Sequence, residues 1–217
     1  MSGAEPADPE AQIRQAFSNL AAILNTADAT WDDVIHVYAF LQDRPRRQPL
    51  LDKVWPEIFP EWGQCPARKA VQYDALNGGS QVVQLQAVAV RGQGPRRDFT
   101  LPNVPVHDTG TMGAALGRYL WSSGLAGNPA GRLGSLEEQA EWAFRHLGVL
   151  VEQAGGGLDG VGQVTTLVRD YADEPVIKAQ WRATFPDAAD EPAHHVAAFG
   201  LNPLNTERVQ LHVAAAF

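Results

Sequence analysis

Two related segments of the chain carry the side chains best suited to chemistry. Residues 65–90 and 191–216 share a Pro-Ala pair followed by strand-like sequence, and the next position is Arg68 in the first segment and His194 in the second. The planar guanidinium of arginine suits bidentate binding of a carboxylate, whereas an imidazole binds an anion only weakly and only when protonated. The segments are therefore alike in predicted shape and unlike in chemistry. The alternative that Arg68 simply pairs with a surface carboxylate stays open.

The other reactive side chains are weaker candidates. His194 and His195 are adjacent, but neighbouring strand residues point to opposite faces, and no Cys or third His follows at ligand spacing. We therefore predict no metal and no cofactor, and His194 is either a pocket residue or a satisfied polar residue at an interface. No base is placed near Cys65 by the sequence, which favours a buried, inert thiol over a nucleophile.

The composition excludes several classes of protein. The chain has 217 residues, a formal net charge of −8 and 45% hydrophobic residues, which favours a packed core and disfavours binding to nucleic acid phosphates. The single cysteine cannot form an internal disulfide, so a reducing compartment is favoured. No apolar run approaches the length of a membrane span, and the N-terminus lacks the pattern of a signal peptide. We expect a cytoplasmic protein that binds neither nucleic acid nor membranes.

The first half of the chain predicts the order helix, strand, helix, strand, strand. Asp8 and Pro9 are typical of a helix start, and apolar residues at helical spacing follow them. The sequence RPRRQP at residues 44–49 indicates a break after the first strand. The expected elements are a loose tail at 1–7, helices at 8–26 and 50–59, and strands at 34–41, 69–73 and 81–90, the last two joined by an Asn-Gly-Gly turn at 77–79.

The second half repeats this order behind two additional strands. Ser135 and Glu138 form a capping box, in which each side chain satisfies a backbone donor near the other, and the helix that they begin runs to the glycines at 155–157. The expected elements are strands at 111–116, 118–123, 162–170, 195–199 and 208–216, and helices at 135–154 and 176–185.

Matching residues make the internal repeat explicit. The helix residues match at an offset of 127, from Gln12 to Gln139, and the later residues match at 126, from Trp55 to Trp181, both of which we expect in the core. The further matches are Ala16, Phe17 and Leu20 with Ala143, Phe144 and Leu147, and Phe59, Pro60, Pro66, Ala67, Gln84 and Leu85 with Phe185, Pro186, Pro192, Ala193, Gln210 and Leu211. This element order predicts an α+β fold, in which each unit is a mixed sheet with two helices packed on one face.

These motifs resemble the RidA/YjgF family of enamine and imine deaminases. The resemblance rests on the PAR-x-x-V turn and strand at 66–71, the closing strand pattern, Ser123-Gly124, and the helix start at 137–139. It implies two fused chorismate-mutase-like domains, namely residues 8–92, which lack the first two family strands, and the complete domain 99–217, joined by a linker at 93–98. By resemblance, family members are trimers with active sites between neighbouring domains, and they hydrolyse imino or enamino acids to 2-keto acids.

The resemblance also implies roles for individual residues. The family arginine that binds the substrate carboxylate matches Arg68 and becomes His194 in the second unit. The family glutamate that positions the hydrolytic water matches Gln84 and Gln210, and glutamine can orient a water but cannot take its proton. The family tyrosine matches Met112, and the family asparagine matches Asp52 and Lys178. A lysine on a helix face is more often solvated than part of a pocket, so that alternative stays open for Lys178.

The sequence thus predicts a divergent enzyme acting on a small carboxylate-bearing imine, enamine or related unsaturated metabolite, and it favours a biosynthetic reaction over general imine removal. In that interpretation Gln84 faces Arg68 in the pocket. The alternative is a noncatalytic ligand-binding or scaffold protein that has lost the deaminase chemistry. Because a sheet without its opening strands exposes an edge, we expect the other unit or another chain to cover it, and hence a homo-oligomer with trimer-like packing of domains.

Overall fold

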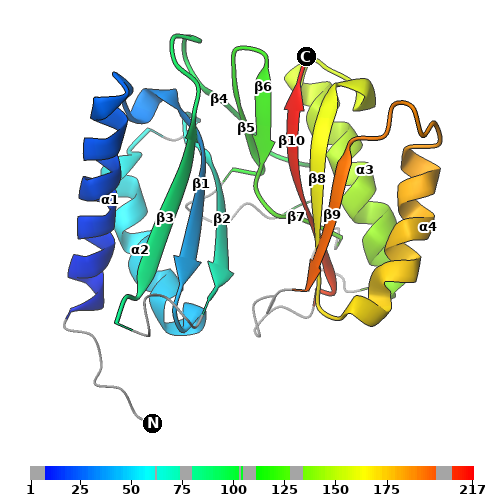
Figure 1. Ribbon diagram of the computed structural model, residues 1–217, viewed down its shortest axis with the longest axis horizontal. Coiled ribbons are helices and arrows are strands. Elements are labelled where there is room, and N and C mark those ends of the chain that lie inside the picture. The colour runs from blue at the N-terminus through cyan, green and yellow to red at the C-terminus, as the bar shows by residue number, and fades with distance from the viewer. Residues whose placement is uncertain are drawn as a thin grey trace.

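The computed structural model describes residues 8–61, 63–73, 80–102, 104, 111–127, 134–198 and 207–217. Two sheets lie next to each other, and helices cover the outer face of each (Figure 1). The predicted α+β fold of mixed sheets, each with two helices on one face, is confirmed. The predicted tail at 1–7 and the turn at 77–79 lie outside the described residues.

The first sheet has three strands in the order β2-β1-β3. Strand β1 pairs in parallel with β2 and antiparallel with β3, and helices α1 and α2 pack on one face. The bounds are α1 Pro9–Thr26, a 3-10 turn at Trp31–Asp33, β1 Val34–Leu41, α2 Arg44–Ile58, β2 Ala67–Gln72 and β3 Val83–Ala89.

Alternate residues of β1 build the core beneath these helices. Val37, Ala39 and Leu41 are fully buried and share a cluster with Phe17 of α1 and Trp55 of α2. The side chains between them point to the opposite face, because successive strand residues alternate. This alternation determines which side chains of β2 and β3 lie on the same face of the sheet and can contact each other.

Helix α2 begins earlier than the sequence predicted. The expected break at residues 44–49 is instead the start of the helix, which runs from Arg44 to Ile58. Pro45 stands in the first turn, where its missing N–H costs no hydrogen bond. The proline therefore starts the helix, and the extra turn places Arg44 and Gln48 on the same face as Asp52.

The second sheet contains the remaining strands, in the order β4-β5-β6-β10-β8-β9, with β7 also pairing with β10. Helix α3 has the predicted capping box, in which Ser135 N–H donates to Glu138 at 2.9 Å and Glu138 N–H donates to Ser135 at 3.2 Å. The bounds are β4 Arg97–Phe99, β5 Gly113–Leu116, β6 Tyr119–Ser122, β7 Leu125–Ala126, α3 Leu136–Ala154, a 3-10 turn at Leu158–Gly160, β8 Val161–Val168, a 3-10 turn at Tyr171–Asp173, α4 Glu174–Thr184, β9 Ala193–Ala198 and β10 Val209–Ala216.

The pairing of the first sheet recurs within the second. Strand β8 pairs in parallel with β9 and antiparallel with β10, as β1 does with β2 and β3. Gln84 lies opposite Phe40 and Gln210 opposite Leu167, at equivalent positions. This recurrence supports the proposed repeat, and the domain boundaries remain a proposal; two residues of the proposed linker, Arg97 and Asp98, lie in the short strand β4.

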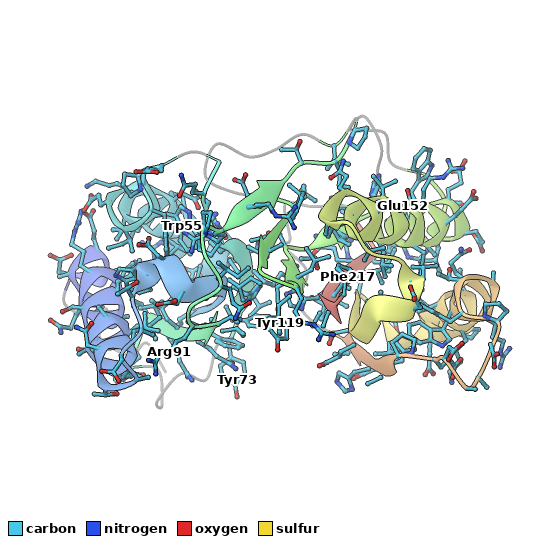
Figure 2. The ribbon with its side chains drawn as sticks, turned by 90° about the horizontal axis from the view of Figure 1, so that it is seen from above. Trp55, Tyr73, Arg91, Tyr119, Glu152 and Phe217 are labelled. Atoms are coloured by element: carbon cyan, nitrogen blue, oxygen red, sulfur yellow. The ribbon has the colours of Figure 1, made fainter. Side chains whose placement is uncertain are left out.

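The two sheets face each other through a small apolar cluster. Ile35 and Ala67 of the first sheet pack against Ala114 and Leu116 of the second, with Tyr119 partly buried beside them. Figure 2 shows Tyr119 between the two helix-bearing halves. Hydrogen bonds extend this contact, because they join β1 and β2 to β10 and to the connection between β6 and β7.

Strand β3 remains at an edge of the first sheet, because no strand pairs with its outer side in the part of the chain that the structure describes. The second sheet packs on the face of the first and leaves this edge unpaired. The sequence predicted that either the other unit or another chain covers this edge. Because the other unit does not cover it, pairing with another chain is the possibility left to test.

We predict that light scattering at micromolar concentration gives a multiple of the 23.5 kDa chain mass, because an open edge strand favours pairing with another chain. A monomeric mass under these conditions would remove the prediction of an obligate homo-oligomer.

Candidate functional site

The candidate site lies where the edge of β2 meets the connection between β6 and β7. The backbone N–H of Arg68 donates to Ser123 Oγ at 3.1 Å. Ser123 is itself held in place, because its hydroxyl donates to the Thr111 carbonyl and its N–H donates to Met112 O at 2.9 Å. This contact joins the first sheet to the second at the residue that the sequence had singled out.

The side chain of Arg68 points toward helix α2. Arg68 lies opposite Val37 in the sheet register, so its guanidinium is on the helix-covered face, where Nη2 donates to Asp52 Oδ1 at 2.7 Å. The guanidinium also lies over the Trp55 ring, 4.8 Å from its centroid, and the Arg68 side chain is only 9% exposed. Asp52 and Trp55 therefore fix the guanidinium in one orientation.

Helix α2 supplies a row of polar side chains that extends from this ion pair. Gln48 Nε2 donates to Asp52 Oδ1 at 3.0 Å, and Arg44 Nε donates to Gln48 Oε1 at 3.1 Å. Arg44, Gln48 and Asp52 are four residues apart and so lie on one face of the helix. This row brings a second guanidinium close to Arg68, whose positive charge helps to lower the pKa of Arg44, after the larger effect of burial.

Lys69 occupies the opposite face of β2, toward the second sheet. It lies opposite Tyr38 and is 6% exposed, and its Nζ donates to Gln210 Oε1 of β10. Gln210 Nε2 in turn donates to Glu207 Oε2 at 2.6 Å. Burial, and then the charge of Arg44, lower the pKa of Lys69 from 10.5 to about 7, while Glu207 acts in the opposite direction.

Gly124 provides the space in which Lys69 and Gln210 meet. A Cβ atom at this position would lie 2.8 Å from Lys69 Nζ and 2.9 Å from Gln210 Oε1. Any side chain there would push these two polar groups apart or displace them. A side chain at residue 124 would therefore require the ends of Lys69 and Gln210 to shift.

We call this group the seam site; its members are Arg44, Asp52, Arg68, Lys69, Ser123, Gly124, Glu207 and Gln210. It holds three basic and two acidic side chains, although the whole chain carries a net charge of −8. A local excess of positive charge in a partly buried place favours a small anion.

Comparison with known proteins gives a family match for the first part of the chain and a fold match to solved structures. Residues 2–91 match the family model described as Endoribonuclease L-PSP. This match covers 90 of the 217 residues, so the first part of the chain is similar to that family. Yeast Mmf1 is similar in structure, with 17% identity, a TM-score of 0.51, and coverage of 56% of this chain and 98% of Mmf1. YyfA from Yersinia pestis, described as a protein of unknown function of the conserved Rid family, has 16% identity, a TM-score of 0.51, and coverage of 56% and 99%.

Three residues predicted from the RidA/YjgF resemblance belong to the seam site: Arg68 and Asp52 pair on the helix-covered face of β2, and Gln210 contacts Lys69 on the opposite face. Gln84 does not join them. It is exposed and lies opposite Phe40, three positions along β1 from Val37, which lies opposite Arg68. An odd separation puts the two side chains on opposite faces of the sheet, so Gln84 does not face Arg68.

The remaining predicted residues lie elsewhere. Met112 is buried in the core beneath α3. Lys178 is exposed and pairs with Glu174 at 3.0 Å on the surface of α4, in line with the solvated alternative. His194 stacks on Trp181 with ring centroids 3.8 Å apart and shares a 3.0 Å hydrogen bond with Thr166, and burial lowers its pKa. His194 thus occupies the place over its tryptophan that Arg68 occupies over Trp55.

Sequence reasoning missed Lys69, Arg44 and Glu207. A lysine between Ala67 and Ala70 in a strand flanked by apolar residues was a usable signal for Lys69, because such a strand is buried on both faces. Arg44 was assigned to a loop, and no sequence pattern indicated the position of Glu207. The roles of Lys69 and Glu207 depend on which sheet faces which, which the local sequence does not encode, and that of Arg44 depends on where α2 begins.

Two other features lie apart from the seam site. A cavity of about 410 Å³ is lined by residues that include Trp31, Ile58, Phe59 and Arg96, and Arg96 donates to the carbonyls of Gln64 at 2.7 Å and Trp31 at 2.9 Å. Cys65 is buried, and burial raises its pKa, which agrees with an inert thiol. Within the described ranges, no three His, Cys, Asp or Glu side chains are grouped to hold a metal, and no helix is long and apolar enough to cross a membrane.

Proposed function

We propose that this chain is a divergent RidA-like enzyme that acts at the seam site on a small carboxylate-bearing imine, enamine or related unsaturated metabolite. The observation that carries the proposal is the meeting of Arg68 and Lys69 from β2 with Ser123 and Gln210 from the second sheet. A site built across two sheets encloses a small molecule better than the surface of either sheet does alone.

The residues take separate roles in this proposal. Arg68 binds the substrate carboxylate, and Asp52 and Trp55 hold its guanidinium in place. Gln210 orients a water or the reacting nitrogen, but its amide cannot accept a proton. The proton transfers must therefore differ from those of a glutamate-dependent deaminase, so we place the reaction in a biosynthetic pathway rather than in general imine removal. A cytoplasmic location, favoured by the single cysteine, belongs to the same proposal.

The alternative is a noncatalytic ligand-binding protein. Two observations favour it: Arg68 is already paired with Asp52, and glutamine stands at both positions of the family glutamate. The family model is described as an endoribonuclease, but a net charge of −8 argues against affinity for RNA phosphates.

Ligand binding and turnover together distinguish these functions. The purified chain should be screened by thermal shift against small keto, imino and aromatic carboxylates, and then assayed for hydrolysis of an imino acid generated in place by an amino acid oxidase. We expect stabilisation by carboxylates together with formation of the 2-keto acid above the uncatalysed rate. Stabilisation without turnover would favour the noncatalytic alternative. The absence of both stabilisation and turnover would contradict both functions.

A further inference from the structure

We propose that the cavity beside Trp31 and Arg96 is a second binding site, which takes an α-amino acid with an apolar side chain in its zwitterionic form. The cavity has a volume of about 410 Å³, within the range of about 300–1,000 Å³ that is typical of small-molecule sites. Its lining comes from the 3-10 turn before β1, from the end of α2 with the loop after it, and from the segment before β4. None of the seam-site residues is among the described residues that line it, so the inference does not depend on the proposed function.

Aromatic and proline side chains form the apolar wall of the cavity. Trp31 packs edge to face on Phe59 with ring centroids 5.4 Å apart, and Phe59 is 6% exposed. Ile58, Pro60 and Pro95 complete this wall. Packed rings and prolines are already in place before a ligand arrives, which reduces the entropy lost on binding. The wall therefore suits the apolar side chain of a small ligand.

Arg96 supplies a fixed donor for a carboxylate. It is 8% exposed, and its Nε donates to the Gln64 carbonyl at 2.7 Å. Its Nη1 donates to the carbonyls of Trp31 at 2.9 Å and Val34 at 2.5 Å. Nη2 donates to no described residue, and it is not one of the buried side-chain atoms that lack a partner. Nη2 is therefore open to a ligand, and a hydrogen bond between a held guanidinium and a carboxylate is among the stronger ones in proteins.

Asp32 and Glu61 supply the opposite charge. Both are exposed residues that line the cavity, and neither forms an ion pair within the part of the chain that the structure describes. A ligand with only a carboxylate would meet these two acids without a positive group to face them. A ligand with only an amine would leave Nη2 of Arg96 without an acceptor. A zwitterion answers both, with its carboxylate toward Arg96 and its ammonium toward the acids.

Isothermal titration of the purified full chain with leucine and phenylalanine tests the proposal. Ligand analogues take the place of an Arg96 variant, because the carbonyls that Arg96 binds make its removal a risk to folding. We expect both amino acids to bind. Leucinamide lacks the carboxylate and N-acetylleucine lacks the ammonium, so each should bind about tenfold more weakly or worse, through the loss of a charge-assisted hydrogen bond.

Variants then locate the ammonium and the site. Asp32→Asn combined with Glu61→Gln should weaken leucine binding about tenfold. Asp28→Asn is the matched control, because the Asp28 side chain is 87% exposed and does not line the cavity, and it should leave the affinity unchanged. Arg68→Ala should also bind leucine with unchanged affinity, since Arg68 belongs to the other site.

The outcomes separate this inference from the proposed function. Equal affinity for leucine and either analogue, or unchanged affinity in the Asp32 and Glu61 double variant, would overturn the zwitterion site. Absence of binding of both amino acids at millimolar concentration would overturn it too and leave the proposed function standing. Loss of leucine binding in folded Arg68→Ala would place the ligand at the seam site and overturn the cavity site. Binding of leucine without binding of any keto or imino acid would contradict the proposed function alone.

Discussion

Replacing Arg68 with alanine is expected to reduce affinity for small carboxylates by about 30-fold or more. Loss of one partner from a buried, hydrogen-bonded charge pair costs about 2–5 kcal/mol, and Arg68 is both the proposed anchor and the partner of Asp52. Arg68→Lys should recover little of this affinity, since a point charge lacks the planar fork of donors. Isothermal titration with pyruvate measures the change directly.

The control for this variant is Arg46→Ala. Arg46 lies on the same helix as Asp52, with a side chain that is 64% exposed, so its removal tests the general loss of a positive charge. Melting temperature and circular dichroism show whether each variant is folded. If folded Arg68→Ala binds pyruvate as tightly as the wild-type chain, Arg68 is not the anchor, and its contact with Asp52 is purely structural.

Acidification from pH 6.5 to pH 5 is expected to destabilise the folded chain through two buried histidines. His36 and His212 share a 3.0 Å hydrogen bond, and Tyr38 shares one of 2.6 Å with His212. Burial, together with the charge of Lys69, lowers the pKa of both imidazoles, that of His212 to about 3. Both therefore stay neutral in the folded state while the unfolded chain takes up protons near pH 6.5.

The direction in which the unfolding free energy changes with pH follows from this difference in proton binding. The unfolded state binds more protons below pH 6.5, so the stabilisation present above that pH is lost as the pH falls. Each histidine contributes about 1.4 kcal/mol of unfolding free energy per pH unit. Lys69 has a pKa of about 7, above this window. Urea denaturation at a series of pH values measures the slope of the unfolding free energy against pH.

Two variants separate this cluster from the other histidines. His212→Gln can still bond to Tyr38 but cannot take up a proton, and it should reduce the slope. His195→Gln, at an exposed position of β9, should leave the slope unchanged. His146 and His194 also have pKa values lowered by burial, so some slope remains in His212→Gln. A wild-type stability that is constant between pH 6.5 and pH 5 would contradict the prediction.

Local patterns were sufficient for most of the fold. The capping box at Ser135 and Glu138 predicted the start of α3, and the apolar run at residues 34–41 predicted β1. Both predictions succeeded because helix caps and strand periodicity depend on residues close in sequence. The predicted start of α2 was wrong because a proline such as Pro45 can either end a segment or begin a helix. Strands β4 and β7 were missed because three and two residues are too few to show a period.

The site was less predictable than the fold. Arg68 and Asp52 were found through a family resemblance, and α2 brings them together within one half of the chain. The choice between Gln84 and Gln210 could not be made from the sequence, since it depends on the pairing register of β3 and on which face of the first sheet meets β10. Lys69 was overlooked for the same reason, because its importance comes from the second sheet that buries it.

The central claim is that the seam between the two sheets binds and transforms a small carboxylate. A crystal structure of the chain with bound pyruvate tests it most directly. We predict that the pyruvate carboxylate contacts the Arg68 guanidinium at the seam site. Pyruvate bound only in the cavity that Trp31, Phe59 and Arg96 line, with the seam site empty and Arg68 still paired with Asp52, would contradict the claim.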